Sequence, residues 1–440
     1  MKLFENIRGT IEDVDGKGRG IMRHEGKEIA TPFVIPGDEA TITLTKRRKG
    51  ELSGHLETIH SPSPHRVAPK CPYAGTCGGC PWQMIDYPKQ LEYKRDLVNR
   101  AFERGALAMR ITEVEPSSEI FYFRNRMDYV FGADGELGLK EPGAWWSVLN
   151  LGTCFLLSEN AVRVMERVRA WAKKHELAPW DNKKYTGLLR YLVIREGKFT
   201  NERCVTLVTS AEPFSETARD DLVFELKNLA TTIYWGVNPT ITDLSIAPEM
   251  TLLNGKRYLT ERVGNFTFDI HPNSFFQTNA YMASRLMDTV RLFAGLTGDE
   301  RVLDLYCGVG FFSIGLAASC KEVIANELDH FAIDLANANA TQNKITNATF
   351  LQGATEDILP KMPRPDVVIL DPPRSGMHPK ALRTLLAFAP KRIVYVSCNY
   401  EALARELPTF LRDYEVINQT ALDLFPHTPH VEVVTAFERK

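Results

Sequence analysis

The sequence has no long apolar run. No stretch of its 440 residues approaches the roughly 18 consecutive apolar residues needed to cross a bilayer. The first ten residues, MKLFENIRGT, are charged from the start and lack the apolar core segment of a secretory signal peptide. We therefore expect a cytoplasmic protein. In a reducing compartment, clustered cysteines indicate a metal site or catalysis rather than disulfides.

The sequence also lacks an excess of charge of either sign. It has 53 Lys and Arg against 55 Asp and Glu, so its bulk charge does not indicate a nucleic-acid-binding protein. Any contact with RNA must come from a local patch such as Lys46–Lys49, although such a run is more often a solvated turn between two strands. There are no internal repeats or low-complexity tracts, and the length indicates two to four domains.

The first part of the chain is dense in short strand patterns. Strands are predicted at Ile7–Ile11, Ile29–Ile35 and Glu39–Leu44, and glycine-containing turns separate them. So many strands in so few residues predict a small β-barrel, similar to an OB-fold, over residues 1–60. A linker at Ser61–His65 follows it.

The segment 61–265 mixes helix and strand and is expected to form an α+β domain. A helix is predicted from Ser158 to about His175, because its apolar residues recur at helical spacing. Leu188–Ile194 and Cys204–Thr209 are predicted to pair as strands around a turn.

Strands alternate with helices over residues 266–440. Helices are predicted from about Phe311 and at Phe331–Asn343. The apolar strands are expected at Arg301–Leu305, Lys321–Ala325, Asp366–Leu370 and Arg392–Val396. This alternation predicts an α/β domain with a parallel sheet covered on both faces.

A glycine-rich turn follows the first of these strands. Gly308 and Gly310 let the backbone approach a ligand closely, and Asp304 places an acid inside the strand end. Ser313 stands where a dinucleotide-binding turn carries its third glycine, which disfavours a pyrophosphate ligand. Glu327, at the end of the next strand, is expected to accept hydrogen bonds from both ribose hydroxyls of an adenosyl ligand. The alternative for Glu327 is a solvated loop carboxylate. The whole unit resembles the class I methyltransferase fold.

Two further strand ends carry candidate catalytic residues. Asp371 begins Asp-Pro-Pro-Arg, and Cys398 lies in Ser-Cys-Asn. Functional groups in open α/β sheets collect at the carboxyl ends of strands, so both are expected beside the glycine-rich turn. A thiolate that adds to carbon 6 of uracil makes carbon 5 nucleophilic enough to attack a sulfonium methyl group. Cys398 is the candidate thiolate, with a buried structural cysteine as an equally plausible explanation of its local surroundings.

This chemistry also needs a base that removes the carbon-5 proton after methyl transfer. Glu432, which ends the segment Phe425–Glu432 and precedes an apolar strand, is the candidate. Taken alone, this carboxylate is more often a surface acid at a strand edge.

A cluster of cysteines near the end of the linker predicts a metal site. Cys71, Cys77 and Cys80 form a Cys-x5-Cys-x2-Cys pattern with two glycines that let the loop curl. Cys154 is the nearest candidate for a fourth ligand, ahead of Cys204. The spacing favours an iron–sulfur cluster, [4Fe–4S], and zinc bound by four thiolates is the alternative.

Together these motifs make the whole chain resemble the iron–sulfur-containing RNA (uracil-5)-methyltransferases, which modify 23S rRNA or the T-loop of tRNA. The resemblance makes the barrel a TRAM domain and the C-terminal domain a class I methyltransferase. The motifs that carry it are the Cys-Gly-Gly-Cys knuckle, Phe276–Asn279, Asp304–Gly310, Asp371–Arg374, Ser397–Asn399 and Phe425–Glu432.

The resemblance also implies roles for individual residues. Cys398 is then the nucleophile and Glu432 the base. The implied contacts to S-adenosylmethionine are Gln277, Tyr306, Glu327 and Asp371. The implied ligands of a [4Fe–4S] cluster are Cys71, Cys77, Cys80 and Cys154. The cluster is expected to stabilise structure or position RNA rather than to act in redox catalysis.

The expected reaction is methylation of carbon 5 of a uridine that is flipped out of structured RNA. Phe275 or Phe276 is expected to stack on the base, and His430 to line the pocket. A 23S rRNA target is favoured, with a tRNA T-loop uridine as the alternative, and a monomer is the default. Methylation of adenine or cytosine, a non-catalytic RNA-binding protein and a redox iron–sulfur protein are the rival hypotheses.

Overall fold

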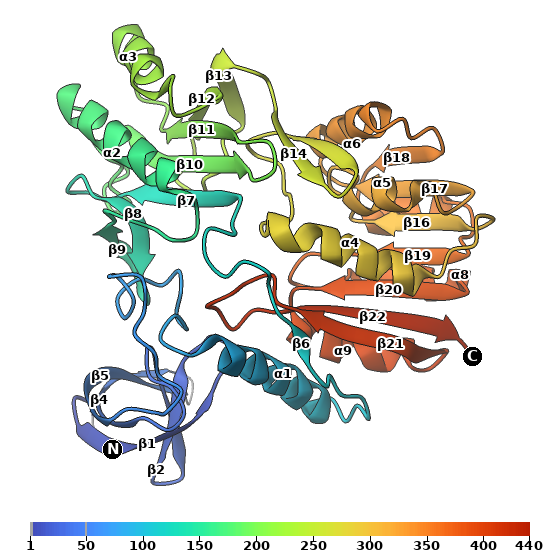
Figure 1. The fold of residues 1–440 in the computed structure, drawn as a ribbon, viewed down its shortest axis with the longest axis horizontal. Coiled ribbons are helices and arrows are strands. Elements are labelled where there is room, and N and C mark those ends of the chain that lie inside the picture. Colours follow the sequence, from blue (N-terminus) through green and yellow to red (C-terminus); the bar gives the residue numbers. More distant parts are fainter. Residues whose placement is uncertain (1–2, 49–50) are drawn as a thin grey trace.

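The computed structural model describes residues 3–48 and 51–440, so Lys49, the last residue of the basic run, lies outside the described residues. Figure 1 shows three parts: a small barrel in blue, a central sheet with two helices in green, and a larger layered part in orange and red. Within the described ranges, no helix is long and apolar enough to cross a membrane.

The N-terminal part is a closed five-stranded barrel, which confirms the predicted architecture. Its alternating apolar residues, such as Ile7 and Ile11 of β1, point into the barrel core. The strands are β1 (Asn6–Val14), β2 (Gly20–His24), β3 (Lys27–Thr31), β4 (Glu39–Arg48) and β5 (Glu51–Ser61). The sequence did not predict β2 or β5; β5 in particular is mostly exposed and therefore carries little apolar alternation.

The barrel is fixed to the rest of the molecule through its β1–β2 side. The Trp82 indole N–H donates to the Gly18 carbonyl at 3.0 Å. Arg100 donates to the Val14 carbonyl at 3.0 Å, and it also pairs with Asp13. Both Trp82 and Val14 are buried in a core that extends into the C-terminal part. The barrel therefore packs directly against the C-terminal part.

The central part is a seven-stranded sheet in the order β13-β12-β11-β10-β7-β8-β9. Its elements are β7 (Arg126–Phe131), β8 (Leu137–Glu141), β9 (Ala144–Asn150), α2 (Glu159–Lys174), β10 (Leu189–Gly197), β11 (Glu202–Thr209), α3 (Glu216–Leu226), β12 (Thr232–Val237) and β13 (Glu249–Gly255). The helix predicted after Ser158 is α2, and the predicted strand pair is β10 and β11, which are antiparallel. A hairpin of β14 (Leu259–Val263) and β15 (Phe266–Ile270) leads to the last part.

The C-terminal part is built on an eight-stranded sheet in the order β18-β17-β16-β19-β20-β22-β21-β6. Its strands are β6 (Val114–Glu115), β16 (Arg301–Leu305), β17 (Glu322–Glu327), β18 (Ala348–Gln352), β19 (Val367–Leu370), β20 (Arg392–Ser397), β21 (Tyr414–Leu422) and β22 (Glu432–Arg439). The first five strands of this order are parallel, as predicted. The predicted parallel sheet is extended at one side by a strand of the other direction, because β22 runs antiparallel between β20 and β21.

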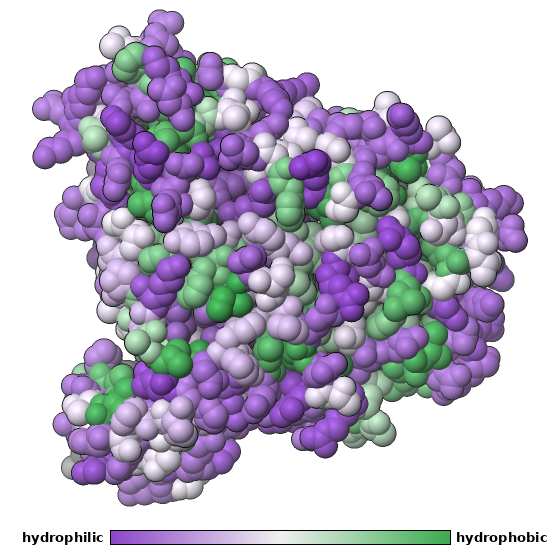
Figure 2. Space-filling model, viewed as in Figure 1, coloured by the Kyte–Doolittle hydropathy of each residue, from purple (hydrophilic) through white to green (hydrophobic). Residues whose placement is uncertain are grey.

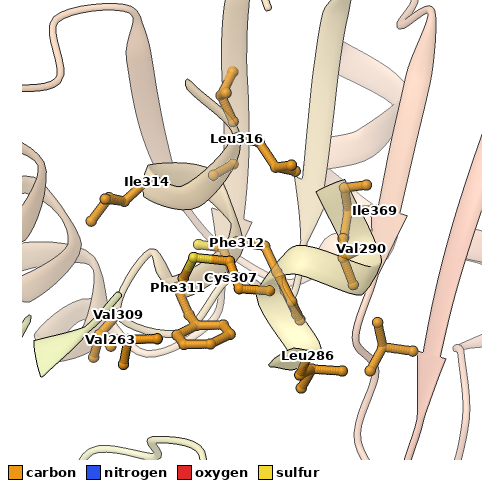
Figure 3. Close-up of a cluster of buried hydrophobic side chains, with 14 of the residues drawn as sticks. Val263, Leu286, Val290, Cys307, Val309, Phe311, Phe312, Ile314, Leu316 and Ile369 are labelled. Atoms are coloured by element: carbon orange, nitrogen blue, oxygen red, sulfur yellow. The ribbon is translucent and has the colours of Figure 1, made fainter. Parts of the chain in front are cut away.

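Helices cover both faces of this sheet. The helices are α1 (Tyr87–Arg104), α4 (Ala280–Ala294), α5 (Phe311–Ala317), α6 (His330–Gln342), α7 (Thr355–Ile358), α8 (Pro379–Phe388) and α9 (Tyr400–Phe410), and a short 3-10 turn spans Leu359–Lys361. On one face, Leu286 and Val290 of α4 pack with Ile314 of α5 and Ile369 of β19 (Figure 3). The other face is covered by α1, α8 and α9.

The expected domain bounds of 1–60, 61–265 and 266–440 stay predictions. α1 and β6 lie within 61–265 in sequence, yet α1 packs on the C-terminal sheet and β6 pairs with β21. Figure 2 shows the barrel as a lobe at the lower left, and the visible surface has scattered hydrophobic patches rather than a continuous apolar belt.

Candidate active site

Four strands bring the candidate catalytic residues to one edge of the C-terminal sheet. β16, β19 and β20 are parallel neighbours, so Tyr306, Asp371 and Cys398 lie together at their carboxyl ends. β22 runs in the opposite direction, which places its first residue, Glu432, at the same edge. The antiparallel direction of β22, which the sequence did not predict, therefore places the candidate base beside the candidate nucleophile.

A pocket opens beside this edge. Gly310 has φ of 84°, and a Cβ there would lie 3.2 Å from the Phe350 ring, so the turn between β16 and α5 needs glycine at this point. The pocket is lined by Phe275, Phe276, Gln277, Tyr306, Cys307, Gly308, Val309, Phe311, Phe312 and Asp371. Three of the four expected cofactor contacts are thus in its wall.

Two carboxyl groups in this region, Asp304 and Asp371, have raised pKa values. Asp304 is fully buried; one oxygen accepts from the Ser313 hydroxyl at 2.5 Å, and the other has no partner among the described residues. Burial raises the pKa of Asp304 to about 6. Burial and the nearby Asp304 charge raise the pKa of Asp371 to about 7, and the Gln277 amide donates to Asp371 at 3.4 Å. An incomplete set of partners for buried acids suits a ligand that is cationic and donates hydrogen bonds.

Glu327, the fourth expected contact, lies at the end of β17 beside the same turn. Its carboxylate accepts from the backbone N–H of Gly308 at 3.1 Å, of Leu328 at 2.7 Å and of Asp329 at 3.1 Å. These amides fix the carboxylate rather than leave it loose in solvent. The region therefore fits an adenosyl ligand with a charged amino-acid tail, although the role of each residue stays a prediction.

Cys398 lies among groups that oppose its ionisation. Burial, followed by the charges of Glu432 and Asp371, raises the pKa of the Cys398 thiol to about 12. Arg374 acts in the other direction and lowers the pKa of this thiol. Burial and the Asp371 charge also raise the pKa of Glu432 well above its ordinary value. Both Cys398 and Glu432 therefore favour their protonated forms in the protein without ligands.

Arg374 links the two loops that carry the catalytic candidates. One guanidinium nitrogen lies 3.1 Å from the His430 Nδ1. The Asn399 amide, directly after Cys398, donates to the Arg374 carbonyl at 2.7 Å. Burial lowers the pKa of His430 to about 4, so this ring is neutral at physiological pH. His430 thus contacts Arg374, and its expected place in the wall of the base pocket stays a prediction.

The loop before Glu432 is held by three polar residues on one face of α1. The Lys94 ammonium donates to Asp423 at 2.5 Å and to the Phe425 carbonyl at 2.9 Å, and Tyr87 donates to the second Asp423 oxygen. Gln90 accepts from the His427 N–H at 2.9 Å. These α1 residues were not identified from the sequence, because they lie more than 300 positions from the loop and carry no local motif.

The four expected cluster ligands come together, although a single-ion site does not form. Among the described residues, no three His, Cys, Asp or Glu side chains are arranged to hold one metal ion. Cys71, Cys77, Cys80 and Cys154 nevertheless all line one pocket with about 390 Å³ of empty space. Burial raises the pKa of the first three thiols, and the Cys154 charge adds to each effect. Cys204 is buried in β11 and does not line this pocket.

The two candidate stacking phenylalanines have different environments. Phe275 is 65% exposed and lines the cofactor pocket. Phe276 is only 3% exposed and packs its ring against Phe268 and Phe311 in the core. The prediction that Phe276 could stack on a base was therefore wrong, because its ring is committed to the core. Phe275 stays a candidate.

Comparisons with known proteins agree with this geometry. The family described as "tRNA (Uracil-5-)-methyltransferase" matches residues 252–440, and the TRAM domain of tRNA (uracil(54)-C(5))-methyltransferase matches residues 7–64. The tRNA (uracil(54)-C(5))-methyltransferase of Pyrococcus horikoshii is 37% identical over 97% of this chain and 99% of its own. The 23S rRNA (uracil(747)-C(5))-methyltransferase of the same organism is 33% identical over 99% and 100%.

A solved structure extends the similarity to three dimensions. The crystal structure of Pyrococcus abyssi tRNA (uracil-54, C5)-methyltransferase with S-adenosyl-L-homocysteine has a TM-score of 0.81 and 34% identity, covering 98% of this chain and 100% of that one. Since relatives well above 30% identity match over nearly the whole chain, the chain belongs to the RNA (uracil-5)-methyltransferases, which transfer a methyl group from S-adenosylmethionine to carbon 5 of uracil in RNA.

Proposed function

We propose that this enzyme methylates uridine 54 in the T-loop of tRNA. The observation that carries the proposal is the full-length similarity to a tRNA (uracil-54, C5)-methyltransferase, at 34% identity and a TM-score of 0.81. The sequence alone favoured 23S rRNA, but tRNA is the more frequent substrate in the names of the relatives, so the alternative becomes the main proposal. A 23S rRNA uridine is the second candidate, supported by the relative that acts on uridine 747.

The proposed reaction begins with Cys398. Its thiolate adds to carbon 6 of the flipped uracil, which forms a carbon–sulfur bond and moves the electron pair towards carbon 5 and the adjacent carbonyl. The neighbouring Arg374 favours the thiolate, because it is the charge that lowers the pKa of Cys398. Because the pKa of the Cys398 thiol is raised in the RNA-free protein, we propose that the thiol loses its proton when RNA binds.

S-adenosylmethionine would supply the electrophilic methyl group for carbon 5; its sulfur–methyl bond would break with the electron pair left on sulfur, and S-adenosylhomocysteine would leave. Gln277 and Asp371 are proposed to hold its charged tail, Tyr306 to form part of the pocket wall and Glu327 to accept from the ribose hydroxyls. Two observations support this: one oxygen of the buried Asp304 has no partner among the described residues, and the Gln277 amide donates to Asp371.

Glu432 completes the proposed cycle. After methyl transfer, its carboxylate takes the proton from carbon 5, the carbon–sulfur bond breaks, and Cys398 leaves as a thiolate. Glu432 then releases the proton to solvent, so atoms and charge balance over the cycle. A carboxylate in a buried site near Asp371 is a stronger base than an exposed one, since its pKa is raised.

The test uses methyl-labelled S-adenosylmethionine with a tRNA transcript, the same transcript with cytidine at position 54, and a 23S rRNA fragment spanning uridine 747. We expect labelled 5-methyluridine in the first tRNA alone. Cys398→Ala should abolish it, while Cys320→Ala, a buried cysteine of the core, should not. Glu432→Gln should accumulate a covalent, methylated enzyme–RNA adduct. Label in the 23S fragment alone would overturn the tRNA assignment, and label in another nucleoside would overturn the mechanism.

We also propose that Cys71, Cys77, Cys80 and Cys154 hold a [4Fe–4S] cluster, with zinc as the alternative. The support is that all four thiols line one pocket, and that their Cys-x5-Cys-x2-Cys spacing with a distant fourth cysteine suits a cluster. Anaerobic reconstitution should produce visible absorbance that Cys77→Ser removes and Cys204→Ser retains. Stoichiometric zinc in place of iron and sulfide would contradict the cluster.

The cytoplasmic location and the monomeric state stay part of the proposal. The eight cysteines, all within the described residues, form no disulfide, which is expected in a reducing compartment. Equilibrium sedimentation of the purified protein tests the monomer.

A further inference from the structure

Three aromatic rings surround the Lys70 ammonium. One of them, Phe155, lines the pocket of the four clustered cysteines, and another, Phe121, contacts the loop Phe425–Glu432, here called the catalytic loop. The Lys70 ammonium lies 4.9 Å from the ring centres of Phe121 and Tyr122 and 4.8 Å from that of Phe155. Lys70 is exposed, and the three rings are half-buried. Because the protein's own ammonium fills the space between the rings, the cluster is not a vacant cage for a cationic ligand.

The backbone that carries one of these rings has a strained conformation. Tyr122 has φ of 55°, a left-handed conformation that is unfavourable for an aromatic residue. Its N–H donates to the Phe155 carbonyl at 2.6 Å, which ties the two ring-bearing segments together. Strained backbone of this kind persists where a side chain has to be presented in one direction, and it clusters at binding sites.

The cluster is continuous with the active site. The Phe121 ring lies over the His427 ring, with centres 4.7 Å apart and planes tilted by 33°. His427 belongs to the loop that α1 holds and that leads to His430 and Glu432. A nucleotide that contacts the rings would therefore be a near neighbour of a uridine bound at Cys398.

We propose that Lys70, Phe121, Tyr122 and Phe155 form a stacking subsite for a single-stranded nucleotide that flanks the target uridine. A nucleotide combines a flat base with a phosphate, and the cluster offers faces for the base and an ammonium for the phosphate. On binding, the base takes the place of the Lys70 ammonium against the Tyr122 ring, and Lys70 moves to a phosphate. The inference rests on the RNA substrate of the proposed function and names how the strand beside the target is held.

The test compares this cluster with a matched pair elsewhere. Phe224 of α3 is 62% exposed, and the Lys227 ammonium lies 4.0 Å from its ring centre, so it is the same type of pair on another element. The dissociation constant of labelled tRNA and of the 23S rRNA fragment is measured without cofactor, over a series of salt concentrations. The variants are Tyr122→Leu, Lys70→Met, Phe224→Leu and Lys227→Met.

Tyr122→Leu should weaken binding of the substrate RNA by roughly tenfold, as expected for the loss of one stacked base. Lys70→Met should also weaken binding. The slope of the logarithm of the binding constant against the logarithm of salt concentration should become smaller by about one, as expected for the loss of one phosphate contact. Both control variants should bind like wild type. Equal binding by Tyr122→Leu and wild type, or an equal loss in Phe224→Leu, would overturn the subsite.

A crosslink distinguishes stacking from a loss of folding. RNA with 5-iodouridine at positions flanking the target is irradiated, and the crosslinked peptide is identified by mass spectrometry. We expect attachment at Phe121 or Tyr122. Tyr122→Leu should keep wild-type affinity for S-adenosylmethionine, which shows that the fold is intact. If this crosslink forms but uridine 54 is not methylated, the subsite stands and the tRNA assignment fails. If Tyr122→Leu methylates uridine 54 and binds the tRNA as wild type does, the tRNA assignment stands and the subsite fails.

Discussion

At the scale of single residues, the site raises the pKa of several ionisable groups. Burial and two neighbouring carboxyl groups raise the pKa of the Cys398 thiol, while the Arg374 charge and a backbone hydrogen bond lower it. Asp371 is a carboxyl whose ionisation burial opposes. Such shifts are typical of functional sites, where charges are held for a ligand rather than for the stability of the free protein.

The first prediction concerns the reactivity of Cys398. Because the pKa of its thiol is raised to about 12, alkylation by iodoacetamide should keep accelerating from pH 7 to pH 10. Arg374→Met removes the charge that lowers this pKa, so alkylation of Cys398 should be several-fold slower at each pH. Mass spectrometry of the Cys398 peptide measures the rate. Arg405→Met, which changes an arginine that donates to the nearby Ser375 carbonyl, is the control. A plateau below pH 9 would contradict the raised pKa.

The second prediction concerns Asp371. Its pKa is about 7 in the folded protein against about 3.9 in the unfolded chain, so the folded state keeps a proton that the unfolded state has lost. The Asp371 contribution to the free energy of unfolding therefore falls as pH rises from about 4 to about 7. Asp371→Asn should raise the stability at pH 8 by on the order of 4 kcal/mol and leave it nearly unchanged near pH 4.

Urea unfolding at the two pH values measures this difference, and calorimetry should show that the variant binds S-adenosylmethionine more weakly. A stability gain of the same size at both pH values would mean that ionisation of Asp371 is not its cause.

At the scale of elements, α1 holds the loop that precedes Glu432, the proposed base. Lys94 and Asp423 are both fully buried, and their ion pair joins the helix to the loop. Lys94→Met removes the ammonium and leaves the Asp423 carboxylate without its cation, so stability should fall by about 3–5 kcal/mol. Denaturant unfolding measures it, and methylation should fall with it because the loop precedes Glu432.

An exposed pair on the same helix is the control for this prediction. Arg104 of α1 pairs with Glu401 of α9, and both side chains are more than half exposed. Arg104→Met should cost less than about 1 kcal/mol, since water screens exposed ion pairs. If both variants lost equal stability, the loss would come from removing any charge on α1 rather than from breaking the buried Lys94–Asp423 ion pair.

The elements differ in how far sequence reveals them. β16, the turn to Gly310 and β17 were predicted well, because each is a short apolar strand closed by glycine or an acid. The antiparallel direction of β22 could not be predicted, since direction depends on pairing with β20 rather than on local composition. The α1 residues were missed for the same reason: Lys94 looks like an ordinary surface lysine until the fold places Asp423 opposite it. Whether Phe275 or Phe276 is exposed was equally a matter of packing.

At the scale of the whole molecule, the barrel touches the catalytic loop. Gly18, in the β1–β2 turn, has φ of 82°, and a Cβ there would lie 3.2 Å from both Pro429 and the Trp82 indole. Gly18→Ala should therefore push the barrel away from the loop, and we expect methylation of tRNA to slow several-fold with unchanged affinity for S-adenosylmethionine.

Gly26→Ala is a close control for that variant. Gly26 lies in the same barrel with φ of 72°, but nothing lies within 4 Å of a Cβ at this position. Both variants should lose on the order of 1 kcal/mol from backbone strain, and only Gly18→Ala should lose methylation rate. Equal rates for the two variants would show that the contact between barrel and loop does not affect catalysis.

The inner position of β22 affects how the sheet forms while the chain is being synthesised. β22 is the last strand of the sheet to leave the ribosome, yet it lies between β20 and β21 rather than at an edge. Until it emerges, β20 exposes an unpaired edge and the catalytic edge has no Glu432. A chain interrupted before this strand can therefore neither close its sheet nor complete the proposed reaction cycle. In the proposed cycle, activity therefore first appears only after β22 has been synthesised, which keeps shorter chains from modifying RNA.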